Sequence, residues 1–165
     1  MNKKRKGLLI WLVLAAMLLT GCTGRMEQEI SVPETVQTTA TTQEQLSVTE
    51  DGEYTSRDAV ALYIHQYGRL PGNYITKKQA QALGWVSKEG NLWQVAPGKS
   101  IGGDRFGNYE GNLPEAEGRQ YYECDIDFDG AYRNAKRILY SNDGLIFYTD
   151  DHYETFTQLY GEVGE

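Results

Sequence analysis

The stretch AKRILYSNDGLIFYT, residues 135–149, indicates the fold class. Its two largely apolar segments, 135–140 and 145–149, are separated by Ser-Asn-Asp-Gly, and these residue types favour tight turns. The pattern predicts a β-hairpin. Similar segments, rich in Tyr, Ile, Phe and Leu and bounded by Gly, Asn and Asp, cover residues 101–106, 120–128 and 155–159. We therefore expect an antiparallel sheet.

Helical patterns precede these strand segments. Large apolar or aromatic side chains recur at i, i+3, i+4 and i+7 between Ser56, the expected N-cap, and Gly68, the expected stop. Thr76 and Gln79 have the spacing of a capping box for a second, short helix, and a third helical turn is expected within residues 91–96. Helices followed by strands indicate an α+β fold.

The N-terminus has the organisation of an export signal. A basic start at residues 3–6 is followed by an apolar run, 8–19, that is shorter than the ~20 residues a membrane span needs. The ending Leu-Thr-Gly-Cys resembles the lipobox of bacterial lipoproteins, which implies a signal peptide over residues 1–21 and lipidation of Cys22. The implied location is extracytoplasmic, either lipid-anchored to the cell membrane or secreted. An uncleaved signal anchor and an ordinary secretory peptide are the alternatives.

Composition separates a tether from one folded domain. Residues 22–52 are rich in Thr, Gln and Glu without regular periodicity and are predicted to be a disordered tether, with the domain at residues 53–160. The 165 residues include 16 Lys and Arg against 23 Asp and Glu, a formal charge of −7. This charge excludes general attraction to polyanions, so any such site must be local. Two Cys are too few for a disulfide framework.

Charged residues alternate with apolar residues on the strand that begins near residue 120. The alternation places Glu123 and Asp125 on one face and Cys124 on the other. Arg133 and Arg137, four residues apart on the next segment, share a face as well. Two carboxylates and two guanidiniums on adjacent segments form either a solvated ladder of ion pairs or a site for an anionic ligand.

The same stretch also resembles the start of an EF-hand calcium loop, because Asp125, Asp127 and Asp129 are followed by Gly. The ninth and twelfth positions of that loop are Arg133 and Lys136. Because cations stand where ligands are needed, we expect no calcium at this loop. No cofactor and no metal are expected elsewhere.

Four long blocks cover most of the folded part: LPGNYITKKQAQALGW at 70–85, GNLWQVAPGKSIGGDRF at 90–106, YRNAKRILYSNDGLI at 132–146 and TDDHYETFT at 149–157. They resemble the barnase and binase family of guanyl-preferring bacterial ribonucleases. The resemblance implies the α+β microbial ribonuclease fold, with N-terminal helices packed on a five-stranded antiparallel sheet.

The resemblance also implies catalytic roles. Glu123 matches the general base for the ribose 2'-hydroxyl, and His152 matches the general acid for the departing 5'-oxygen. A carboxylate and an imidazole suit these roles near neutral pH. The cations that match the family's phosphate site are Lys77, Arg133 and Arg137, and the supporting carboxylates are Asp125 and Asp104.

Base recognition is implied for a loop and two aromatic residues. The matching residues are Phe106, Gly107, Asn108, Tyr109 and Glu110 for guanine, and Tyr132 and Tyr153 for stacking. The Glu110 carboxylate can accept from the N1 and N2 hydrogens of guanine. Gly107 and Tyr109 depart from the family, which has Ser and Arg at these positions.

The function implied is an endoribonuclease that cleaves single-stranded RNA after guanosine and forms a 2',3'-cyclic phosphate. The protein is expected to be a monomer that meets the membrane only through its lipid anchor, and a barstar-like inhibitor protein is a further implied partner. A catalytically weak RNA-binding module and a partner-binding surface lipoprotein are the alternatives.

Overall fold

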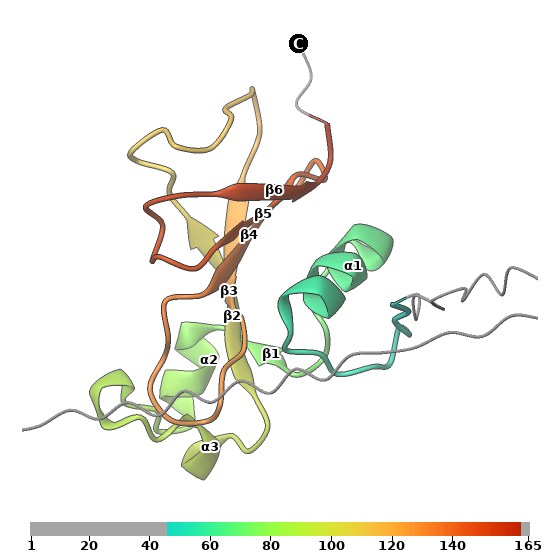
Figure 1. Ribbon diagram of the computed structural model, residues 1–165. Helices are drawn as coiled ribbons and strands as arrows, with labels where there is room; N and C mark the ends of the chain where they lie inside the picture. Colours follow the sequence, from blue (N-terminus) through green and yellow to red (C-terminus); the bar gives the residue numbers. More distant parts are fainter. Residues whose placement is uncertain (1–45, 163–165) are drawn as a thin grey trace, which may run out of the picture. The chain divides into compact units, whose positions relative to one another are not determined.

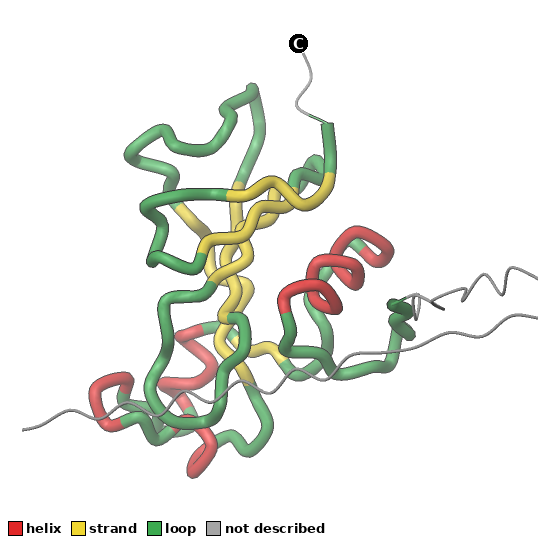
Figure 2. The backbone as a smooth tube through the Cα atoms, viewed as in Figure 1, coloured by secondary structure: helices red, strands yellow, loops and turns green. Residues whose placement is uncertain are grey.

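The computed structural model describes residues 46–162. The predicted signal peptide, the lipidation site Cys22 and most of the predicted tether lie outside this range. Helices lead into strands, as expected for an α+β fold (Figure 1; Figure 2). The elements are α1 (Arg57–Tyr67), β1 (Tyr74–Ile75), α2 (Lys77–Ala82), the 3-10 turn η1 (Ser87–Glu89), α3 (Leu92–Val95), β2 (Ser100–Phe106), β3 (Tyr121–Asp125), β4 (Arg137–Ser141), β5 (Ile146–Thr149) and β6 (Thr157–Tyr160).

The sheet has the strand order β1-β2-β3-β4-β5-β6. Strands β2 to β6 pair antiparallel in sequence, which confirms the predicted five-stranded antiparallel sheet. The short β1 adds a sixth strand that runs parallel to β2. A strand of two residues is too short to produce a period-2 pattern, so the sequence did not reveal it.

The predicted strand at 120–128 is too long. Strand β3 ends at Asp125, because the chain leaves the sheet there: Asp127 has a φ of +51° and its backbone N–H donates to the carbonyl of Thr55 (2.9 Å). The segment from 126 to 136 is therefore a loop, and it carries Arg133 outside the strands.

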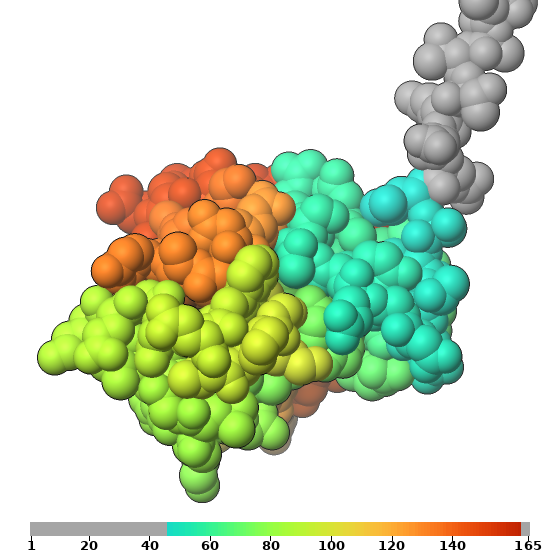
Figure 3. Space-filling model, turned by 90° about the horizontal axis from the view of Figure 1, so that it is seen from below, coloured from blue at the N-terminus to red at the C-terminus, as the bar shows by residue number. Residues whose placement is uncertain are grey.

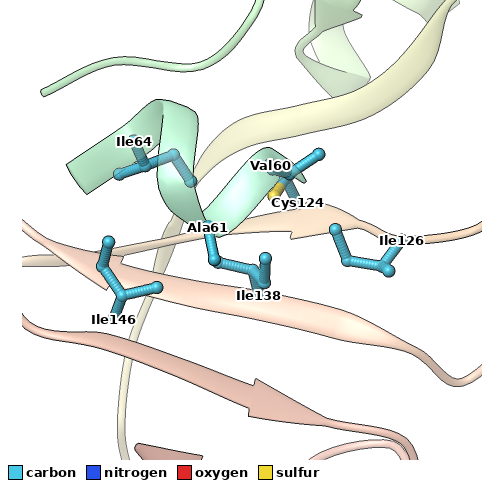
Figure 4. Packing of buried hydrophobic residues seen from close by; sticks show 7 residues of the cluster. All are labelled: Val60, Ala61, Ile64, Cys124, Ile126, Ile138 and Ile146. Atoms are coloured by element: carbon cyan, nitrogen blue, oxygen red, sulfur yellow. The ribbon is translucent and has the colours of Figure 1, made fainter. Parts of the chain in front are cut away.

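Helix α1 packs against one face of the sheet. A buried apolar cluster joins the two, and it consists of Val60, Ala61, Ile64, Cys124, Ile126, Ile138 and Ile146 (Figure 4). Because strand side chains alternate, the residues between these on β3 point to the opposite face. The prediction that Cys124 lies on the face opposite Glu123 and Asp125 is therefore confirmed.

The helix termini agree with the sequence in part. Gly68 ends α1 in the left-handed region, and Thr76 and Gln79 form the predicted capping box of α2. Ser56 occupies the predicted N-cap position of α1 with extended backbone. Its side chain, however, makes no capping hydrogen bond. Its carbonyl accepts from the N–H of Val60 instead (3.0 Å).

The folded domain begins before residue 53. Val48 is buried against Ala59 and Tyr63, and the Tyr63 hydroxyl donates to the carbonyl of Glu50 (2.7 Å). Figure 3 shows this N-terminal segment lying along the residues of α1. Residues 48–52, which composition assigned to the tether, thus belong to the domain. Within residues 46–162 no helix is both long enough and apolar enough to cross a membrane.

Candidate active site

Glu123 lies on β3, on the sheet face opposite α1, and is buried. Its Oε1 accepts a hydrogen bond from Lys77 Nζ and its Oε2 from the Tyr153 hydroxyl, both at 2.5 Å. Burial by itself raises the pKa of Glu123, but the bonds from Lys77 and Tyr153 and the nearby positive charges outweigh burial and hold the pKa below its usual value. The carboxylate is therefore ionised at neutral pH and can take up a proton.

A β-bulge places Asp104 beside this pair. The register of β2 against β3 shifts between Gly102 and Asp104, and Gly103 adopts a φ of +91°. The extra residue brings Asp104, rather than Gly103, opposite Glu123. Asp104 Oδ2 then accepts from the backbone N–H of Lys77 (2.9 Å), the first residue of α2. Asp104, predicted as a supporting residue, thus fixes the N-terminus of α2, where Lys77 lies.

Asp125 holds both predicted arginines. Arg133 donates to it through Nε (2.7 Å) and Nη2 (2.6 Å), and Arg137 Nε lies 3.0 Å from Asp125 Oδ1. Arg137 and Asp125 are each only 1% exposed. A solvated ladder of ion pairs is therefore the wrong interpretation, because Asp125 and Arg137 are removed from water and only Arg133 keeps part of its side chain exposed.

The same contacts speak against the EF-hand. The carboxylate of Asp125 is engaged by Arg133 and Arg137, and Asp127 Oδ2 accepts from Lys136 Nζ at 2.7 Å. Two of the three aspartates of the EF-hand-like stretch are thus ion-paired to Arg133, Arg137 and Lys136, in agreement with the expectation that no calcium binds here.

His152 lies in the loop between β5 and β6, which Asp151 organises. The Asp151 carboxylate accepts from the Thr149 hydroxyl (2.7 Å), from the Thr155 hydroxyl (2.5 Å) and from the Thr155 backbone N–H (3.0 Å). These bonds lower the pKa of Asp151. His152 and Tyr153 have φ values of +62° and +77°, a backbone region that is uncommon for residues other than glycine. The loop thus holds an exposed imidazole in a fixed, strained turn.

One open pocket of about 480 Å³ joins these groups. Its lining residues are Arg105, Phe106, Gly107, Asn108, Tyr109, Glu110, Asn112, Glu123, His152, Tyr153 and Glu154. The structure therefore brings the predicted base, the predicted acid and the whole predicted guanine loop together. The predicted cations Lys77, Arg133 and Arg137 are not in this lining, and neither is Tyr132, which is 66% exposed on the loop after β3.

Two of the lining residues, Asn112 and Glu154, received no role from the sequence. Both lie in loops. Glu154 falls within the block at 149–157, but its place in the lining follows only from the tertiary structure.

The guanine loop is rigidly built. Asn108, with a φ of +45°, accepts from the N–H of Leu113 and donates to its carbonyl, both at 3.0 Å. The Tyr109 ring lies so close to Gly107 that a Cβ on Gly107 would be 2.3 Å from it. The glycine at 107 therefore permits this position of the tyrosine ring, so the two departures from the family belong together. Glu110 is exposed at the loop tip and forms no salt bridge with any described residue.

The α+β fold carries a carboxylate and clustered cations on the sheet face opposite α1, with an imidazole in an adjacent loop, as the resemblance to microbial ribonucleases implies. The model of the ribonuclease family matches residues 57–160, and the chain belongs to this family. A ribonuclease of Bacillus intermedius is 60% identical over 102 residues, which are 62% of this chain and 63% of the relative. A ribonuclease of Heyndrickxia coagulans is 59% identical over 102 residues, which are 62% and 94% of the two chains.

A third relative is named for its base preference. The guanyl-specific ribonuclease St of Saccharopolyspora erythraea is 40% identical over 55 residues, 33% of this chain and 54% of the relative. The resemblance to guanyl-preferring bacterial ribonucleases is thereby confirmed. The matched part spans about 63% of the length of the Bacillus relative.

Proposed function

We propose that this protein is a metal-independent endoribonuclease that cleaves single-stranded RNA after guanosine by transphosphorylation to a 2',3'-cyclic phosphate. The observation that carries the proposal is the single pocket lined by Glu123, His152 and the loop from Phe106 to Glu110. The family membership and the guanyl-specific relative support it.

The chemistry assigns one proton transfer to each of two groups. The Glu123 carboxylate takes the proton of the ribose 2'-hydroxyl while the 2'-oxygen attacks phosphorus. The bond from phosphorus to the 5'-oxygen breaks, and protonated His152 donates a proton to that oxygen. The products are the cyclic phosphate and a free 5'-hydroxyl. Because the nucleophile is already part of the substrate, no activated water is needed for this step.

Cations held by Glu123 and Asp125 stabilise the phosphate as its charge grows. Lys77 reaches Glu123, and Arg133 and Arg137 are fixed by Asp125 two residues further along β3. Donors that are already in place cost no reorganisation at the moment of reaction. Arg133 is the more accessible arginine, with 21% of its side chain exposed against 2% for Arg137, and it is the direct phosphate ligand in this mechanism.

Guanine is read by the loop that lines the same pocket. The exposed Glu110 carboxylate accepts from the N1 and N2 hydrogens, which adenine does not offer in this pattern. Phe106 stacks on Tyr153 with ring centroids 5.3 Å apart, so the guanine loop is packed against the loop that carries His152. Base recognition and proton donation are thus held at a fixed distance.

We further propose that the domain works outside the cytoplasm as a monomer, anchored through a lipid on Cys22 or released. The N-terminal sequence pattern supports this location. Labelling with a clickable fatty acid tests it, since Cys22→Ser should abolish incorporation. A barstar-like inhibitor would dock over the pocket that His152 lines, and it would compete with RNA there.

Cleavage of the dinucleotides GpU and ApU by the full chain tests the activity. Glu123→Ala and His152→Ala should each lower kcat/KM on GpU by at least ~100-fold, because general acids and bases contribute ~10²–10⁴. His65→Ala is the matched control, since His65 lies on α1, where it stacks on Tyr160. Near-native activity of either site variant removes that residue from the mechanism.

Product identification separates the alternatives. A guanosine 2',3'-cyclic phosphate product supports the proposal. RNA that is bound without release of this product indicates an RNA-binding module. Neither binding nor cleavage indicates a lipoprotein that binds another partner.

A further inference from the structure

A second pocket, of about 510 Å³, adjoins the first. The two pockets share the segment from Arg105 to Tyr109, which forms a wall of each. The other lining residues of the second pocket are Glu115, Ala116, Arg119, Gln120 and Tyr121. All but Tyr121, the first residue of β3, come from the long loop between β2 and β3, which projects beyond the ends of these strands (Figure 1). We call this the loop pocket. A ligand that fills the first pocket can continue into the loop pocket across the shared segment.

The walls of the loop pocket are held by hydrogen bonds. Gln120 Nε2 donates to the carbonyls of Phe106 (3.3 Å) and Tyr121 (2.7 Å). Arg119 donates to the carbonyl of Pro114 (3.0 Å) and to Asp143 (2.8 Å), and its side chain is only 8% exposed. The hollow is therefore a built feature of the loop, formed before any ligand arrives.

Arg105 supplies a positive charge with no acidic partner. Residues 46–162 contain six arginines, and five of them form salt bridges with Asp or Glu. Arg105 is the exception in that range, because its guanidinium donates only to the neutral side chain of Gln120. Glu115 also lines the pocket but does not pair with it. An exposed guanidinium with free donors is well suited to phosphate oxygens.

Tyr109 supplies a flat aromatic surface at the boundary of both pockets. Its side chain is 95% exposed, yet its ring rests on the backbone at Gly107. An aromatic ring that is open to solvent can act as a stacking platform for a base. Arg105 and Tyr109 thus present a phosphate ligand and a base platform on one short segment.

The direction of the RNA follows from the catalytic groups. Glu123 and His152 line the first pocket but not the loop pocket. The scissile phosphate and the leaving nucleotide on its 3' side belong with them. The nucleotide on the 5' side of guanosine leaves the guanine loop in the other direction.

We propose that the loop pocket binds the nucleotide immediately 5' of the cleaved guanosine, with its base on Tyr109 and the connecting phosphate on Arg105. This inference rests on the proposed ribonuclease function. With this subsite the protein recognises one nucleotide more than guanosine. It should therefore cleave oligonucleotides more efficiently than dinucleotides.

The test compares kcat/KM of the full chain on GpU, on pGpU and on dApGpU, in which the 2'-deoxy sugar prevents cleavage after adenosine. We expect a gain of at least about threefold for pGpU over GpU and about tenfold for dApGpU. Arg105→Gln should remove the gain for pGpU. Tyr109→Leu should keep the pGpU gain and lose the further gain from the adenosine. Lys88→Gln is the matched control, because Lys88 is exposed and forms no salt bridge with the described residues.

The gains are ratios within one variant, so a change in basal activity does not affect them. Cleavage of GpU without any gain for dApGpU overturns the subsite and leaves the proposed function standing. A gain that persists in Arg105→Gln and in Tyr109→Leu also overturns it. If no substrate is cleaved, the proposed function fails and the subsite falls with it.

Discussion

Replacement of Lys77 by Met should move the acid limb of the pH profile. The ammonium group lies 2.5 Å from Glu123 Oε1 and is one of the groups that hold the pKa of Glu123 below its usual value of 4.5. An opposite charge at close range lowers a carboxyl pKa by about 1–3 units. Because the Lys77 side chain is 39% exposed and Glu123 only 8%, solvent screens the lysine from one side, and the low end of that range applies. We expect the acid limb to move to higher pH, by an amount at the low end of that range.

The measurement is kcat/KM on GpU between pH 3 and pH 8, with circular dichroism at each pH to restrict the fit to folded protein. Only the position of the limb matters, since the loss of Lys77 also lowers the rate. Lys78→Met is the matched control on the same helix, because Lys78 forms no salt bridge with any residue in 46–162. An unchanged limb, or one that moves to lower pH, would refute the electrostatic role of Lys77.

The same pair predicts a change in stability. A carboxyl whose pKa is lower in the folded state stabilises the fold above its unfolded pKa, and this contribution is lost as the pH falls through the folded value. The difference in free energy of unfolding between wild type and Lys77→Met should therefore be largest at neutral pH and shrink as the pH falls below the usual glutamate value of 4.5. Urea titrations at pH 7 and pH 3.5 measure it, and an equal difference at both values would contradict the assignment.

Three further changes have defined outcomes. Glu110→Gln should reduce the ratio of the GpU to the ApU cleavage rate at least ~10-fold, because guanine then lacks its hydrogen-bond acceptor and such a loss is strongly discriminated against. Glu115→Gln should leave this ratio unchanged. Equal GpU and ApU cleavage rates in the wild type would contradict the role of Glu110. Val48→Ala should destabilise the domain by about 1 kcal/mol in urea titrations, as expected for buried methyl groups, whereas Leu46→Ala, which is 49% exposed, should have little effect. The kcat/KM for long RNA should decline only shallowly with salt, with a slope of log kcat/KM against log salt of roughly 1.4–2.1 for two or three neutralised phosphates. A slope steeper than about 4 would show that the acidic residues lie away from the path of the RNA.

The strands and helices could be predicted from local patterns because their side chains meet regular surfaces. Residues that face α1 alternate along β3 and β4, and the alternation is visible in the sequence. The N-terminal segment near Val48 escaped prediction because a single buried side chain in a polar stretch has no periodicity. The two-residue strand β1 escaped for the same reason.

The candidate site was predicted by resemblance more than by spacing. Spacing alone placed Glu123 and Asp125 on one face but left a solvated ladder open. Residue spacing does not tell how exposed a side chain is. Asp125 and Arg137 are each 1% exposed, and only the packed structure shows this. The Gly102–Asp104 bulge was also invisible, because a register shift depends on the partner strand rather than on the strand itself.

An acidic domain can act on a polyanion if the charge of its site changes during the reaction. Lys77 is paired with Glu123, so its charge is largely balanced when the substrate arrives. In the proposed mechanism Glu123 becomes neutral as it takes the 2'-hydroxyl proton, and the ammonium group loses its negative partner at the moment when charge builds on the phosphate oxygens. Lys77 then interacts more strongly with the transition state than with bound RNA, and only such differential interactions accelerate the chemical step. Arg133 and Arg137 remain paired with Asp125, which takes no part in proton transfer, so they contribute to substrate and transition state more evenly.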